Sequence, residues 1–146
     1  MYTGLLHTHS ILRYLVLLFL LIVIANSFLG FSGKKGFGKL DNGLSLTLFS
    51  VTHTQFLIGI LLYFTSPFVQ FSGAAMKDAS LRYWTAEHNV MMLIAIVLIT
   101  VARTTMKKMS DGASKHKRLL IFNSIALVII LVGISMSKRG FFGLPG

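Results

Sequence analysis

The sequence predicts an all-α fold, an antiparallel up-down bundle of four membrane-spanning helices, and three observations support this. Four long apolar runs fill the chain of 146 residues, of which 54% are hydrophobic and only 12% are charged. The mean hydropathy is +0.75, which is typical of an integral membrane protein and not of a soluble domain. Each run approaches the roughly 20 residues that a helix needs to cross the hydrocarbon core.

The four spans are expected at about residues 11–30, 44–66, 84–102 and 119–136. The first is too long for a signal peptide and lacks a small-residue cleavage site, so we interpret it as an anchor. Asp41-Asn42-Gly43 predicts a turn or cap before the second span, and Pro67 ends that span. Asp78 is expected to cap the third helix, with Trp84 at headgroup level. Asp111-Gly112 breaks the chain before the fourth span. Four spans use roughly 80 residues, so residues 1–146 are predicted to form one domain.

The basic residues are distributed unevenly between the two ends of the predicted bundle. The net charge is +10, and nine of the 14 Lys and Arg residues lie around the first and third connections: Lys34, Lys35, Lys39, Arg103, Lys107, Lys108, Lys115, Lys117 and Arg118. Cytoplasmic loops of membrane proteins carry such an excess. Both connections are therefore expected in the cytoplasm and both termini outside it, in a bacterial inner membrane. The charge indicates orientation in the lipid bilayer and not binding to nucleic acid.

The chain contains no cysteine. This excludes disulfides, thiolate metal sites, iron–sulfur clusters and the covalent attachment of c-type haem. Any haem must therefore be held non-covalently, by histidine or methionine.

Each predicted span is associated with a histidine, and these are His9, His53, His88 and His116. Ionisable groups at membrane depth are costly and therefore suggest function. A histidine on each of several packed helices is also the pattern of bundles that hold haem or a metal. The four histidines, together with Arg13 as a partner for a haem propionate, are the candidate cofactor-binding residues, and His9, His53 and His88 are the candidate metal ligands.

Depth decides which histidines can pair across a haem. His9 and His88 both lie on the outer side, within about two turns of each other. His53 is near mid-bilayer and differs from His116 by more than about 10 Å on a helix count. An outer haem on His9 and His88 is therefore easier to build than an inner one, and His53 with His88 is a second pair.

Each histidine also has a structural interpretation. His88 would bond to a neighbouring helix, with Met91 and Met92 as ordinary packing on its face. His9 would contact lipid headgroups, and His53 would bond to Asn123. His116 would belong to a charged surface cluster that covers residues 115–118.

Several short motifs resemble small four-span membrane proteins described as cytochrome b-like. They are His7-Thr8-His9-Ser10, His53-Thr54-Gln55-Phe56-Leu57-Ile58-Gly59, Met76-Lys77-Asp78-Ala79, Glu87-His88-Asn89-Val90-Met91-Met92 and Lys115-His116-Lys117-Arg118. Together they are distributed over nearly the whole chain. The resemblance implies haem b and electron transfer within or across the membrane.

The sequence therefore predicts a membrane protein that binds one or two haem b groups and passes electrons, with quinone or a respiratory-chain protein as partner. One alternative is a non-redox accessory subunit of a membrane complex. Another is a copper-handling protein that uses His7, His9, His88, Met91 and Met92, since imidazole and thioether suit Cu(I). There is no phosphate-binding loop, activated nucleophile or carboxylate pair, which argues against a hydrolase or transferase. The sequence is compatible with a component of an oxidoreductase, and with either a homo-oligomer or a hetero-oligomer.

Overall fold

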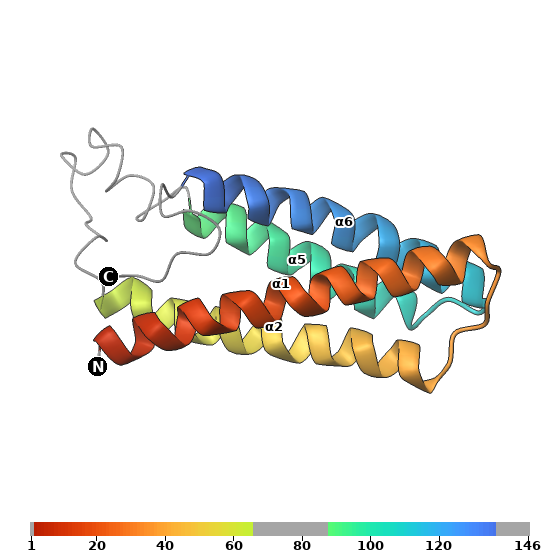
Figure 1. Ribbon diagram of the computed structural model, residues 1–146, viewed down its shortest axis with the longest axis horizontal. Coiled ribbons are helices and arrows are strands. Elements are labelled where there is room, and N and C mark those ends of the chain that lie inside the picture. Colours follow the sequence, from red (N-terminus) through yellow and green to blue (C-terminus); the bar gives the residue numbers. More distant parts are fainter. Residues whose placement is uncertain (1, 66–87, 137–146) are drawn as a thin grey trace.

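The computed structural model describes residues 2–65 and 88–136, which form a bundle of four helices (Figure 1). These are α1 (Tyr2–Ser32), α2 (Lys39–Thr65), α5 (His88–Met106) and α6 (Gly112–Met136). All four are long and apolar enough to cross a membrane. The predicted all-α membrane bundle is therefore confirmed, and the described ranges contain no strand. The expectations for Pro67, Asp78 and Trp84 fall outside the described residues.

Three helices begin well before the apolar runs that predicted them, and one of these is α2, which begins at Lys39 and not near residue 44. Helix α1 begins at Tyr2 and not near residue 11, so His9 lies two turns inside it. Helix α6 begins at Gly112 and not near residue 119, so His116 lies within its second turn. Hydropathy identified the apolar part of each helix and missed the turns that extend it at its beginning.

The connection between α1 and α2 is a compact turn with a cap on each side. Lys34 has a φ of 52°, and the Lys35 N–H donates to the Gly30 carbonyl at 2.9 Å, which is the pairing of a Schellman motif. At the start of α2, the Gly38 N–H donates to Asp41 Oδ2 at 2.8 Å. Asp41 therefore caps α2, as predicted, but α2 already begins at Lys39, so residues 41–43 lie inside the helix and not in a turn before it.

Asp111 caps α6 at the point where the sequence predicted only a break in the chain. Its Oδ2 accepts a hydrogen bond from the Ser114 backbone N–H at 2.9 Å. The hydrogen bonds from the backbone and side chain of Ser114 hold the pKa of the Asp111 carboxyl below its usual range. The cap fixes where the second hairpin turns back into the membrane.

The helices do not pack with equal closeness around the bundle. Helix α1 contacts α2 and α6 extensively, and α6 packs most extensively against α5, whereas α2 and α5 touch far less. The order around the bundle is therefore α2, α1, α6, α5, with a loosely packed seam between α2 and α5. Helices α1 and α5 are diagonally opposite each other. Large apolar side chains such as Phe28, Leu57 and Val128 remain exposed around the outside, as a lipid-facing surface requires.

Small side chains bring α1 and α2 close together. Ser45 and Thr52 are both 3% exposed, and a Cβ at Gly59 would lie 3.5 Å from Cε1 of His9. These three positions recur every seven residues and form one stripe that faces α1. Across the same interface the Gln55 side chain donates to the His9 carbonyl at 2.8 Å.

Candidate functional site

His9 has an unsatisfied ring nitrogen inside the α1–α2 interface. The residue is half-buried, its Cε1 faces Gly59, and its Nδ1 atom is buried without a hydrogen-bond partner in the described part of the chain. The Gln55 side chain donates a hydrogen bond to the His9 backbone carbonyl and thereby ties this part of α1 to α2. An imidazole nitrogen with a lone pair and no proton partner in a low-dielectric site is suited to bind a metal.

The packing contacts place His9 and His88 at the same depth. Gly30 of α1 lies against His116 of α6, and Gly133 of α6 lies against Met92 of α5. His116 and Gly133 are 17 residues apart on α6. Because α1 runs antiparallel to α6, the residue of α1 level with Gly133 lies 17 residues before Gly30, which is Arg13. Met92 of α5 lies at the same level, since it contacts Gly133. His9 and His88 each lie four residues further toward the same end of the bundle. Figure 1 shows that end as the one where α1 and α5 both begin.

The methionines that follow His88 pack against α6. A Cβ at Gly133 would lie 2.6 Å from Cε of Met92 and 4.0 Å from Sδ of Met91. Both thioether side chains therefore fill the space that Gly133 leaves open. This is the packing interpretation of the two methionines, whose side-chain ends lie against Gly133 of α6.

Arg13 lies one turn further along α1 than His9, toward the middle of the bundle. Its Nη2 donates to the Tyr14 hydroxyl at 3.1 Å, and its guanidinium carbon is 4.9 Å from the centre of the Tyr14 ring. The neighbouring tyrosine therefore holds the guanidinium of Arg13 near the surface of α1. A propionate that reached Arg13 would have to extend inward from the level of His9.

His53 is held by groups of the protein on both sides of its ring. Nδ1 donates to the Phe49 carbonyl at 2.8 Å, and Nε2 lies 3.5 Å from the Thr100 hydroxyl across the α2–α5 seam. Asn123, the partner expected from the sequence, is not among these contacts. Thr100 is twelve residues beyond His88, or about 18 Å along α5, so this arrangement does not bring His53 and His88 together.

Replacement of His53 by alanine is expected to lower the free energy of unfolding by about 1 kcal/mol, because one inter-helix polar contact in a membrane protein contributes about this much. Denaturant unfolding of the full chain in detergent micelles measures it. Thr54→Ala is the matched control, since the Thr54 hydroxyl is exposed and bonds only within its own helix, to Ser50. A visible spectrum that changed with His53→Ala would show instead that His53 is an iron ligand.

The structure corrects the expectation that His116 belongs to a charged surface cluster. Its side chain is only 1% exposed and lies under Gly30, where α1 crosses α6. Nε2 donates to the Gly36 carbonyl at 3.1 Å, and the Phe37 ring lies 5.2 Å from the imidazole. The physical reason is that α6 begins four residues before His116, which turns the ring inward while Lys117 stays exposed.

Within residues 2–65 and 88–136, no three His, Asp or Glu side chains come together as a metal site. His7, the fifth histidine, is exposed near the start of α1. The closed multi-ligand sites typical of structural zinc are thus not found in this part of the chain. A haem held between two imidazoles needs only the level pair that His9 and His88 provide.

Two polar residues that matter for the bundle were missed by sequence reasoning. In the sequence Gln55 is only one residue of a motif and Arg103 only a charge near a loop, yet Arg103 is 8% exposed inside the last turn of α5. Its Nη1 donates to the Oδ1 of Asn42 at 3.2 Å. The available signal was position, because Arg103 directly follows the predicted third span.

Compared with known proteins, the sequence matches no family model, no curated protein and no solved structure.

Proposed function

We propose that this protein binds haem b in the membrane between His9 and His88 and transfers electrons. The single observation that carries the proposal is the placement of His9. It presents a buried, unpartnered Nδ1 at the same depth as His88, on the helix diagonally opposite. Axial ligands of a haem in a four-helix bundle project inward from facing helices at one level.

The residues of the chain have separate tasks in this proposal. Gln55 donates a hydrogen bond to the His9 backbone carbonyl and so holds this residue in place, and Gly59, which has no side chain, lies next to Cε1 of the His9 ring. The surrounding apolar side chains exclude water and so influence the reduction potential. The haem itself would supply one-electron redox chemistry. The partners are then a quinone or a respiratory-chain protein.

Copper handling is supported less well than haem binding. The soft ligands that it needs, Met91 and Met92, fill the space over Gly133 on α6. The accessory-subunit alternative has firmer support, since His53 and His116 both bond to protein groups of other segments. That alternative requires the purified protein to be colourless.

The visible spectrum of purified protein from haem-replete cells tests the proposal. We expect a Soret band and, after dithionite reduction, an alpha band of b type, with a pyridine haemochrome of protohaem. A folded, colourless protein would favour the accessory-subunit alternative. Stoichiometric copper without a Soret band would favour the copper alternative.

The proposed orientation places both termini outside the cytoplasm of a bacterial inner membrane. All nine described Lys and Arg residues other than Arg13 lie at the end of the bundle where α1 joins α2 and α5 joins α6. Because basic residues favour the cytoplasmic side, a reporter fused after Gly146 is expected to be active only if it functions outside the cytoplasm. The same fusion with a cytoplasm-dependent reporter is the control, and activity of that control would reverse the orientation.

A further inference from the structure

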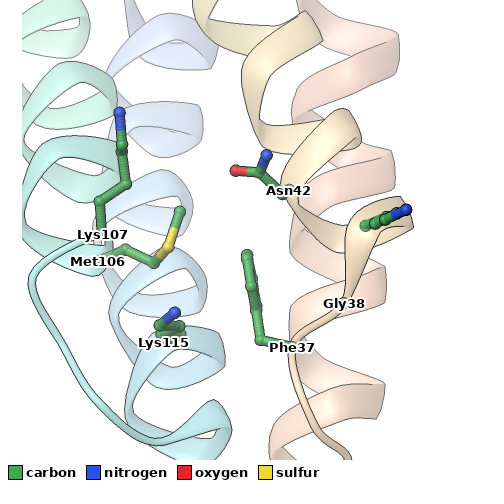
Figure 2. A pocket seen from close by; sticks show the side chains of 7 residues that line it. Phe37, Gly38, Asn42, Met106, Lys107 and Lys115 are labelled. Carbon is green, nitrogen blue, oxygen red and sulfur yellow. The ribbon is translucent and has the colours of Figure 1, made fainter.

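An open pocket of about 420 Å³ lies at the end of the loosely packed seam between α2 and α5. Figure 2 shows it from close by, with Met106, Lys107 and Lys115 on one side and Phe37, Gly38 and Asn42 on the other; Lys39 completes the lining. We propose that this pocket binds the phosphate headgroup of an anionic glycerophospholipid.

The charges of the pocket select an anion. Three of its seven lining residues are lysines, and the buried Arg103 lies directly behind it, bonded to the backbone and side-chain oxygens of Asn42 at 3.4 and 3.2 Å. A guanidinium this well buried raises the potential of the pocket, because it is poorly screened by water.

Nearby carboxylates do not neutralise these cations. In the described ranges the acidic residues are Asp41 and Asp111, and both have other partners. Asp41 accepts hydrogen bonds from the Asn26 side chain at 2.6 Å and from the Gly38 N–H at 2.8 Å. Asp111 caps α6 through Ser114. Even with Asp41 counted, the pocket and Arg103 retain a net positive charge.

The position of the pocket favours a lipid over a soluble anion. The apolar part of α2 begins at Lys39, and that of α5 ends at Met106, so the pocket lies where hydrocarbon meets headgroups. Met106, which is 1% exposed, gives it an apolar floor, and the adjoining Leu40 is 72% exposed beside Lys39. A phosphodiester would meet the lysines while an acyl chain lay along Leu40. Basic pockets between helices at this depth bind such headgroups in other membrane proteins.

The test compares two pairs of substitutions in the full-length protein in detergent micelles. Lys39→Gln with Lys107→Gln removes two exposed lysines from the pocket, and Lys108→Gln with Lys117→Gln removes two exposed lysines of the same end that do not line it. Phosphatidylglycerol is titrated into the micelles, with thermal unfolding and lipid retained in native mass spectrometry as readouts. Phosphatidylcholine and inorganic phosphate are the comparison ligands.

Wild type is expected to gain thermal stability from phosphatidylglycerol and not from phosphatidylcholine or inorganic phosphate. The pocket pair should weaken this lipid by about 25-fold, since one lysine near an anionic headgroup contributes about fivefold. The control pair should retain most of the affinity. Equal weakening by both pairs, or no effect of the lipid on wild type, would overturn the pocket. Equal stabilisation by inorganic phosphate would overturn the lipid assignment.

Discussion

Replacement of His9 by alanine is expected to abolish haem binding while the bundle stays folded. The loss should exceed the roughly 10–100-fold in affinity that removal of a mere supporting partner costs, because an axial ligand itself disappears. His88→Ala should do the same, since the two imidazoles lie at one level on diagonal helices. The measurement is the Soret absorbance per protein after reconstitution with haemin, with far-UV circular dichroism as the check on folding.

Two comparisons separate ligation by His9 from a structural role. His7→Ala removes an exposed histidine two residues away and should leave the spectrum unchanged. Added imidazole should restore the spectrum of His9→Ala, because it can occupy the vacated position beside Gly59. A His9→Ala variant that kept the wild-type spectrum without imidazole would exclude His9 as a ligand.

Gly30→Ala is expected to destabilise the bundle strongly, although the substitution adds only one methyl group. The new Cβ would lie 2.5–2.6 Å from Cε1, Nε2 and Nδ1 of His116. That ring cannot retreat easily, because it is 1% exposed, bonded to the Gly36 carbonyl and packed against Phe37. Overpacking of this kind costs about 1–3 kcal/mol, more than the about 0.5–1 kcal/mol that alanine gains over glycine in a helix.

Denaturant unfolding in micelles measures the effect, and Gly43→Ala is the matched control. A Cβ at Gly43 in α2 would meet no atom within 4 Å, so this variant should be as stable as wild type or slightly more so. The double variant Gly30→Ala with His116→Ala should be more stable than the sum of the two single changes predicts, since the clash needs both groups. Strict additivity would mean that the α1–α6 contact is not as tight as the structure shows.

The four helices of the described residues could be predicted because the bilayer imposes a length on any apolar segment. The cap at Asp41 and the chain break at Asp111-Gly112 were also predictable, since turn chemistry is local. The extent of α6 was not, because the basic residues around His116 resemble a loop while their backbone still forms helix. The burial of His116 follows from that missed turn and from Gly30, a residue 86 positions away in the sequence.

The common depth of His9 and His88 was expected from helix counting, and the contacts of Gly30 and Gly133 show how α1 and α5 are aligned along α6. The partners of His53 could not be predicted, because they depend on how α2 and α5 lie relative to each other. For Arg103 the sequence showed only its position directly after the third span, and it did not identify Asn42 as the partner onto which the side chain folds back. Inter-helix register is a property of the whole bundle and not of any one span.

An experimental structure of the purified, haem-loaded protein tests the central claim most directly. We expect one iron with a ring nitrogen of His9 and a ring nitrogen of His88 each about 2.0–2.1 Å away, as in imidazole–metal bonds generally. We also expect that His53 keeps its bond to the Phe49 carbonyl. An iron bound by His53, or a folded protein in which His9 and His88 bond only to protein groups, would contradict that claim.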